Sequence, residues 1–355
     1  MKKNKKFALV GCGRIAKRHS ELLGLNQIQG AELVSVCDIV YEKAKKIGNR
    51  FDVPAYDDMD KMMQGESVDV VVVLTPSGLH AENVINLSKY GKDIMVEKPM
   101  ALTLDDADAM IKACDQNSCK IFVIKQNRFN VPVVKLREAL EAGRFGKLIL
   151  GTVRVRWARH QAYYDQDEWR GTWAMDGGVL TNQASHHVDL LEWMMGDVDS
   201  VFAKTTTALA RVETEDTAVV TLKFRNGGLG VIEATTATRP KDLEGSISIL
   251  GEKGTVVVGG FAVNKMETWS FEDAQKEDDE VIEKFSVNPP NVYGFGHQAY
   301  YEHVVDCVAN GGQNLVDGLQ GRKSLELISA IYESVETGKE VFLRFNPKKC
   351  KLGHR

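Results

Sequence analysis

The feature that constrains the fold most is a glycine-rich turn near the start of the chain, where residues 11–16 read GCGRIA. An apolar run over 7–10 precedes this turn, and residues 16–25 have helical spacing. The first glycine permits a tight turn, the second lets a pyrophosphate approach the backbone, and the small Ala16 lets helix and strand pack closely. The following helix N-terminus offers unpaired N–H groups to phosphate. The pattern predicts a strand–turn–helix unit that binds a dinucleotide.

The first 125 residues continue this alternation of strand and helix. Strands are expected at 33–37, 68–74, 93–96 and 121–124, and helices at 41–51, 81–90 and 104–114. The valine-rich run over 68–74 is typical of a strand buried on both faces of a parallel sheet. We therefore predict an α/β fold with a doubly wound Rossmann sheet over residues 1–125.

Asp38 ends the second expected strand, about 25 residues after the glycines, where a carboxylate can accept hydrogen bonds from ribose hydroxyls. A carboxylate there repels a 2′-phosphate, so NAD is favoured over NADP. The alternative is that Asp38 only caps a loop. The loop TPSGLH at 75–80 follows the third strand, and loops at that end of a parallel sheet line the ligand crevice. Its Pro76 and Gly78 are also compatible with plain turn chemistry.

After Lys147 the apolar pattern changes to long alternating segments. Strands are expected at 148–158, 201–206, 217–224, 229–237, 246–250, 255–258 and 265–271, with a hairpin turn at 251–254 and closing helices at 300–309 and 321–337. This predicts a second, α+β domain over residues 126–345 with a large, mostly antiparallel sheet. Residues 346–355 are expected to form a basic tail.

Composition excludes several functional classes. The 355 residues are too many for one small core, and the net charge of −4 gives no bias toward nucleic acid or membrane. No apolar run approaches the roughly 20 residues that span a bilayer, and the basic start is too short in apolar residues for a signal peptide. The six cysteines lack zinc-type pairing, so we expect reduced thiols in a cytoplasmic protein.

A second motif, EKP at 97–99, ends the fourth expected strand. Together with the glycine turn, QNR at 126–128, and GG at 177–178 followed by H-x-x-D over 186–189, it resembles the Gfo/Idh/MocA oxidoreductase family along nearly the whole chain. The resemblance implies that Lys98 lies beside the nicotinamide and helps to deprotonate the reacting hydroxyl. It also implies an open-faced second sheet that pairs subunits into dimers or tetramers.

The chain departs from this family at Asn182, where members commonly have an aspartate four residues before the histidine. An amide accepts no proton at ordinary pH, so a proton relay through that position is in doubt, although Asn182 can hydrogen-bond a hydroxyl or Lys98. His186 becomes the second acid–base candidate. His187 points about 100° away on a helix and is expected to be structural. Adjacent histidines cannot share one helix face, so no metal site is expected.

The stretches RWARHQAYYD at 156–165 and WRGTW at 169–173 resemble one branch of the family, the UDP-N-acetylglucosaminuronate 3-dehydrogenases. Asn182–Gln183 and VYGFGH at 292–297 suit the same branch. The resemblance implies NAD-dependent oxidation of the C3 hydroxyl of a UDP-linked sugar acid, in surface-polysaccharide biosynthesis. Arginines can hold a carboxylate or diphosphate, and tyrosines can stack on sugar or uracil. The alternative is an aromatic loop with solvated arginines.

The expected site follows from these motifs and the resemblance. Lys98 and His186 are the catalytic candidates, and which of them takes the proton stays open. The residues expected to contact NAD are Gly11, Cys12, Gly13, Arg14, Ile15, Asp38, Thr75, Ser77, His80, Glu97, Lys98, Gln126, Trp169 and Arg170. Those expected to contact substrate are Lys98, Arg159, Gln161, Tyr163, Asn182 and His186. The alternatives are a dehydrogenase of a free polyol such as an inositol, and a non-catalytic NAD-binding regulator. Also open is whether NADH is released or recycled in place by a 2-oxo acid.

Overall fold

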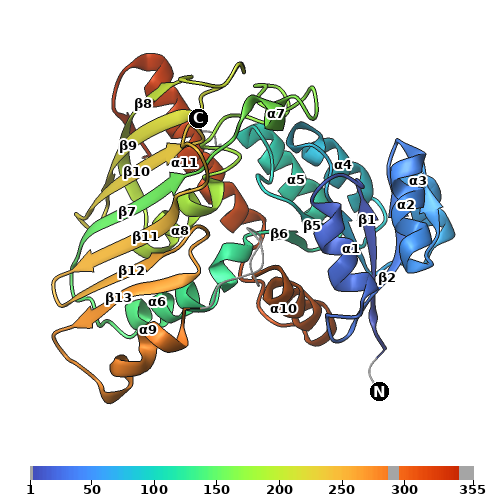
Figure 1. The fold of residues 1–355 in the computed structure, drawn as a ribbon. Helices are drawn as coiled ribbons and strands as arrows, with labels where there is room; N and C mark the ends of the chain where they lie inside the picture. Colours follow the sequence, from blue (N-terminus) through green and yellow to red (C-terminus); the bar gives the residue numbers. More distant parts are fainter. Residues whose placement is uncertain (1–2, 287–295, 344–355) are drawn as a thin grey trace, which may run out of the picture.

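The structure, a computed structural model, describes residues 3–286 and 296–343 (Figure 1). The basic tail expected at 346–355 and residues 292–295 of the VYGFGH motif lie outside the described residues.

The N-terminal half is built on a six-stranded parallel sheet with the order β3-β2-β1-β4-β5-β6, as the alternating pattern predicted. The strand order changes direction between β1 and β4, and a crevice at such a point binds ligands in open α/β sheets. The strands are β1 Lys5–Val10, β2 Ala31–Cys37, β3 Ala55–Tyr56, β4 Val70–Val73, β5 Asp93–Val96 and β6 Ile121–Val123. The helices are α1 Ala16–Gly24, α2 Tyr41–Phe51, α3 Met59–Gly65, η1 Ser77–Leu79, α4 His80–Ser88 and α5 Leu104–Gln116.

The second half is built on an eight-stranded sheet with the order β13-β12-β11-β7-β10-β9-β8-β14. All neighbouring pairs are antiparallel except β7 and β10, so the sheet is mixed but mostly antiparallel, as expected. The strands are β7 Leu148–Arg156, β8 Val198–Thr206, β9 Thr217–Phe224, β10 Leu229–Thr235, β11 Glu244–Gly251, β12 Gly254–Gly259, β13 Lys265–Phe271 and β14 Val341–Phe342. The expected hairpin joins β11 to β12, where Leu250 pairs with Thr255.

Helices cover one face of this second sheet. Figure 1 shows α6 (Val131–Glu141), α8 (Ser185–Met195) and α11 (Gly318–Thr337) on the side that faces the parallel sheet. The remaining helical segments of the described chain are η2 Gln126–Phe129, α7 Gln161–Tyr164, η3 Lys276–Glu280, α9 Val281–Lys284 and α10 Gly296–Asn310. From Ala218 to Phe224 of β9, buried and exposed residues alternate, which places one face in the apolar core of this half and the other toward solvent.

Helix α10 differs from the expectation that residues 300–309 close the second domain. Tyr300, Tyr301 and Val304 are fully buried in the apolar core of the parallel sheet. The chain therefore returns from the second sheet to the first before it ends. The sequence pattern could not show this, because an amphipathic helix does not reveal which of two cores it covers.

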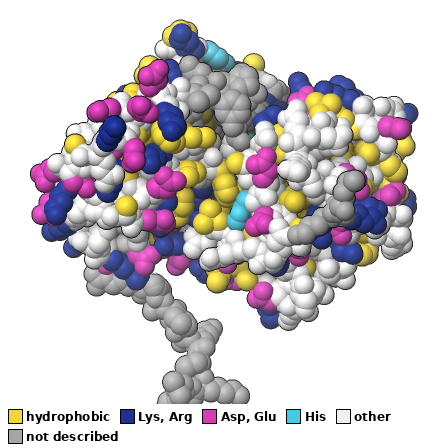
Figure 2. Space-filling model, turned by 90° about the horizontal axis from the view of Figure 1, so that it is seen from below, with side chains coloured by type: hydrophobic (Ala, Val, Ile, Leu, Met, Phe, Trp, Pro, Cys, Tyr) yellow, Lys and Arg dark blue, Asp and Glu magenta, His cyan; other side chains and the backbone are white. Residues whose placement is uncertain are grey.

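The surface carries charges of both signs. On the face seen from below in Figure 2, Lys and Arg side chains are interspersed with Asp and Glu. Within residues 3–286 and 296–343, no helix is long and apolar enough to cross a membrane.

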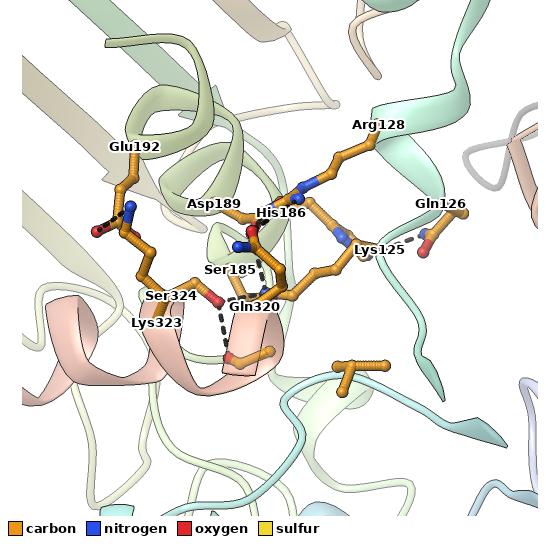
Figure 3. A network of polar contacts seen from close by, with 12 residues as sticks. Lys125, Gln126, Arg128, Ser185, His186, Asp189, Glu192, Gln320, Lys323 and Ser324 are labelled. Carbon is orange, nitrogen blue, oxygen red and sulfur yellow. Dashed lines mark hydrogen bonds and ion pairs between the residues drawn. The ribbon is translucent and has the colours of Figure 1, made fainter. Parts of the chain in front are cut away.

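A buried ionic network joins the two halves (Figure 3). Arg128, in the segment after β6, donates from Nε and Nη2 to the two carboxylate oxygens of Asp189 on α8, each at 2.8 Å. Lys125 Nζ lies 3.5 Å from Asp189 Oδ1 and donates to Ser324 Oγ on α11 at 2.5 Å. Burial alone would raise the pKa of Asp189, but Arg128 and Lys125 hold it at about 2. The network fixes α8, which also carries His186.

We predict that Asp189→Asn destabilises the fold by about 3–5 kcal/mol, because it leaves two buried cations without a counter-charge. The native pKa of about 2 lies below the unfolded value of ~3.9, so this stabilisation is present above about pH 4 and fades as the pH falls toward 2. Urea unfolding should therefore show a large gap between wild type and variant at about pH 7 that shrinks toward about pH 3.

Asp197→Asn is the matched control, because Asp197 pairs with Lys323 at 2.6 Å on the surface, and exposed pairs contribute less than about 1 kcal/mol. A loss in Asp189→Asn no larger than in this control would contradict the prediction.

Candidate active site

One cavity of about 650 Å³ lies between the two halves and opens at the carboxyl ends of β1, β2, β4 and β5. It brings together residues from motifs far apart in the chain. Of the residues expected from sequence, it is lined by Gly11, Gly13, Arg14, Ile15, Asp38, Thr75, Ser77, His80, Glu97, Lys98, Gln126, Arg159, Tyr163, Trp169, Arg170, Asn182 and His186.

Two expected residues do not line the cavity. The Cys12 thiol lies 3.6 Å from the carbonyl oxygen of Cys37, and only its backbone N–H takes part in the turn. The Gln161 side chain donates to Asp165 at 2.9 Å and accepts from the Arg211 N–H at 2.8 Å. For Gln161 the structure shows a local structural role, and contact of either residue with ligand stays a prediction.

The turn after β1 has the shape that the glycines predicted. Gly11 has φ +96°, and a Cβ there would lie 2.7 Å from the Leu74 carbonyl carbon, so only glycine fits. A Cβ on Gly13 would meet no atom within 4 Å, which leaves its backbone open toward the cavity. The Asp38 carboxylate accepts from the N–H groups of Cys12 at 2.7 Å and Val40 at 2.8 Å. Asp38 thus caps the loop and also lines the cavity.

A hydrogen bond of His80 holds the loop after β4 against the EKP segment. The two ring nitrogens of His80 lie 2.8 Å from the Pro99 carbonyl oxygen and 2.9 Å from that of Thr75. Asn83 donates to Thr75 Oγ1 at 2.9 Å. These contacts hold the two loops that flank the crevice in fixed relative positions.

Glu97 is the centre of a buried cluster that sequence reasoning missed. His19 Nε2 lies 3.0 Å from Glu97 Oε1, and His19 Nδ1 lies 2.7 Å from the Tyr301 hydroxyl. Burial would raise the pKa of Glu97, but hydrogen bonds from His19 and His297 hold it well below its ordinary value. Its other oxygen accepts from the Lys98 N–H at 3.0 Å. The three possible ligand atoms of His19, Glu97 and His297 lie within 4.8 Å of one another, and the absence of a metal stays a prediction.

The side chain of Lys98, which follows strand β5, extends to the second half of the chain and contacts Asn182. Its Nζ donates to the Asn182 backbone oxygen at 2.9 Å and lies 3.4 Å from Asn182 Oδ1. Burial lowers the pKa of Lys98, partly opposed by the charges of Glu97 and Asp176. A lysine with a lowered pKa is better suited to accept and return a proton than an ordinary lysine.

His186 stands at the start of α8 and lines the same cavity. Its Nε2 lies 2.9 Å from the Gln126 amide nitrogen, and because an amide nitrogen only donates, this ring nitrogen accepts. Burial, with Lys98 and Lys125 nearby, holds the pKa of His186 well below its ordinary value, so the ring is neutral. Within the described residues, His186 Nδ1 and Gln126 Oε1 are buried without a partner, as expected of a site that a ligand completes.

A wall of arginine and aromatic rings closes the cavity. Arg170, whose side chain is 8% exposed, donates from Nε to Asp167 at 2.9 Å and from Nη1 to the Tyr163 hydroxyl at 3.1 Å, and it lies over the Trp169 ring. Arg159 donates from Nη1 to Asp242 at 3.0 Å. Among the hydrogen bonds of the described residues, Nη2 of each arginine is unused, so both can still bind an anion.

Several lining residues were not assigned a role from sequence: Trp157, Asp167, Asp176, Gln183 and His297. Asp176 stands next to the glycine pair that marked the motif, so a signal was present. His297 ends the VYGFGH motif that was matched to the branch, so a signal was present there too, although no role was assigned to it.

Comparison with known proteins agrees with this geometry. Residues 5–125 match the family model described as the oxidoreductase family, NAD-binding Rossmann fold, and residues 137–343 match the C-terminal alpha/beta domain of the same Gfo/Idh/MocA family. D-apiose dehydrogenase of Paraburkholderia graminis is 26% identical over 96% of this chain and 90% of its own length. Myo-inositol 2-dehydrogenase of Thermotoga maritima is 30% identical over 74% of this chain and 76% of its own length.

Two solved structures resemble the chain over nearly its full length. The WlbA dehydrogenase of Chromobacterium violaceum, in complex with NADH and UDP-GlcNAcA, is 43% identical with a TM-score of 0.91 and 98% coverage of both chains. The WlbA dehydrogenase of Bordetella pertussis, with the same two ligands, is 41% identical with a TM-score of 0.89 and covers 97% of this chain and 100% of its own. The family models, the Rossmann turn and the cavity together show that this chain belongs to the Gfo/Idh/MocA family of oxidoreductases and that its cofactor is NAD.

Proposed function

We propose that the chain is an NAD-dependent dehydrogenase that oxidises the C3 hydroxyl of UDP-N-acetylglucosaminuronate to a ketone, a step of surface-polysaccharide biosynthesis. The observation that carries the proposal is the similarity to two WlbA dehydrogenases crystallised with UDP-GlcNAcA, at 41% and 43% identity over nearly the whole chain. The cavity supports it, because it combines a catalytic-type lysine with arginines suited to an anionic substrate.

The turn and the strand ends suit NAD. The backbone at Gly13 would receive the pyrophosphate, and the Asp38 carboxylate would accept from the adenosine ribose hydroxyls. A negative charge at Asp38 disfavours the 2′-phosphate of NADP. When bound, the nicotinamide ring supplies the hydride acceptor.

The protein must remove the hydroxyl proton as the carbinol is oxidised. In our proposal the C3 hydroxyl lies between Lys98 and His186, which line the same cavity. Lys98, with its lowered pKa, takes the proton, while Asn182 holds the Lys98 side chain in position through two oxygens. His186, neutral and held by Gln126, can donate to the substrate from its Nδ1–H, which has no partner among the described residues. It is the second candidate for the proton, which it can take at Nε2 only when the hydrogen bond from Gln126 breaks.

The arginine wall would recognise the acidic sugar nucleotide. The free N–H groups of Arg159 and Arg170 fit a carboxylate or diphosphate, and the Tyr163 ring lies between them, within 5.5 Å of one guanidinium and 4.8 Å of the other. A free polyol carries no charge that needs these groups. The curated relatives that act on inositol and apiose nevertheless make a neutral polyol the second candidate.

We also propose that the chain assembles through the outer face of the second sheet and acts in the cytoplasm. That face exposes Phe202, Val219 and Leu229 beside an ion-pair ladder of Arg156 with Glu233 and Glu244. A second copy would bury these apolar side chains. A molar mass of one chain in solution would contradict the assembly.

The five cysteines of the described residues are free and buried, which suits a reducing compartment.

The substrate is tested by mass spectrometry of UDP-N-acetylglucosaminuronate after incubation with the protein and NAD, with and without 2-oxoglutarate. The proposal predicts a loss of about two mass units, for one hydride and one proton. The 2-oxo acid arm reveals turnover even if NADH stays bound. An unchanged sugar nucleotide in both samples, together with oxidation of an inositol, would favour the polyol reaction instead.

Lys98→Ala should lower kcat by roughly 10²–10⁴-fold, because it removes the proton acceptor, while NAD affinity stays within about threefold of wild type. Stopped-flow reduction of NAD and calorimetric binding measure the two quantities separately. Lys89→Ala, an exposed lysine of the same half, is the control and should behave as wild type. Retained turnover in Lys98→Ala would exclude Lys98 as the acid–base group.

A further inference from the structure

A buried carboxylate stands directly behind Asn182. Asp176 is 2% exposed and lines the cavity. Its Oδ2 accepts from the Gly171 N–H at 2.8 Å, and its Oδ1 accepts from Asn182 Nδ2 at 2.5 Å. Both oxygens thus face donors, as suits an ionised carboxylate.

This contact orients the Asn182 amide. Because the amide nitrogen donates to Asp176, the amide oxygen is the atom left toward Lys98, and it lies 3.4 Å from Lys98 Nζ. The reverse orientation would place an N–H group against the lysine ammonium and an oxygen against the carboxylate, and both contacts would be repulsive. The chain Asp176–Asn182–Lys98 therefore has one favourable arrangement.

The geometry points to Asp176 as a positioning residue that holds the Asn182 amide against Lys98. Asp176 also supplies, through its hydrogen bond with Asn182, the negative charge that an asparagine at position 182 lacks. The effect on turnover rests on the proposed function, since it requires Lys98 to be the acid–base group of the reaction. The effect on the ionisation of Lys98 does not depend on the substrate.

The charges around Lys98 determine the direction in which loss of the Asp176 charge would shift the pKa of Lys98. Burial lowers the pKa of Lys98, Glu97 and Asp176 raise it, and Arg170 and Arg159 lower it. Burial also raises the pKa of Asp176, while the Gly171 N–H, Lys98 and Asn182 oppose that rise. Removing the Asp176 charge leaves the two arginines less balanced, so the pKa of Lys98 must fall further.

The test is Asp176→Asn, with the ionisation of Lys98 followed by competitive labelling. Trace acetic anhydride is reacted with the intact protein across a pH series, and peptide mass spectrometry gives the rate at Lys98. We expect the midpoint for Lys98 to move to lower pH by roughly half a unit or more. With the sugar nucleotide as substrate, kcat should fall about 10-fold or more, and the rising limb of the pH profile should move the same way.

Glu215→Gln is the matched control. Glu215 is also buried and also holds the segment that carries Asn182, since it accepts from the Leu180 N–H at 3.0 Å, but it lies outside the lining of the main cavity. A glutamine can still accept this bond and that of Tyr332, so the Lys98 midpoint should stay at its wild-type pH. If Asp176→Asn does not fold, Asp176→Ser removes the same charge and carries the same expectation.

A Lys98 midpoint that is unchanged or raised in a folded Asp176 variant would overturn the inference, as would an equal shift in Glu215→Gln. A lowered midpoint in the Asp176 variant alone would support it, even if the wild-type protein left the sugar nucleotide unoxidised. That last result would refute the proposed function and leave the role of Asp176 intact.

Discussion

The contact on which the site depends is the one from Lys98 Nζ to the two oxygens of Asn182. It joins the end of a strand in the parallel sheet to the loop before α8 in the second half, so it forms only when the two halves are docked. The buried network of Arg128 and Lys125 with Asp189, in the second turn of α8, also holds that docking. Helix α8 therefore contributes to both the site and the stability of the fold. Its first turn carries His186, which lines the cavity, and its next turn carries Asp189, which belongs to the ionic network.

Charge balance explains how a buried lysine can lie in this position. Fully desolvated, the ammonium group would be costly, and burial alone lowers its pKa. Glu97, held ionised by His19 and His297, compensates from the strand side, and Asp176 compensates through Asn182 from the loop side. The arginine wall acts in the opposite direction and keeps the lysine able to release its proton. Two anions, Glu97 and Asp176, and two cations, Arg159 and Arg170, therefore act on the lysine, and in our proposal the cations bind the acidic substrate.

The sequence pattern was sufficient to predict features that depend only on neighbouring residues. The positive φ of Gly11 and the strand-end positions of Asp38 and Lys98 all follow from a few neighbouring residues. The packing of α10 on the first sheet and the approach of His19 to Glu97 depend on contacts between distant segments, which no local pattern encodes. Contact of Gln161 with substrate remains a prediction, and its local hydrogen bonds explain why it does not line the cavity. In the short helix α7, residues two positions apart face different ways, so Tyr163 enters the cavity while Gln161 turns to Arg211.

The most direct test of the proposed oxidation at C3 follows the transferred hydride. UDP-N-acetylglucosaminuronate carrying deuterium at C3 is incubated with the protein and NAD, and the reduced cofactor is analysed by mass spectrometry and proton NMR. Hydride transfer from C3 predicts a reduced nicotinamide that is about one mass unit heavier, with the deuterium at C4, and a sugar that has lost its label. Unlabelled NADH, or a sugar oxidised with its C3 deuterium retained, would contradict the proposed transfer of a hydride from C3.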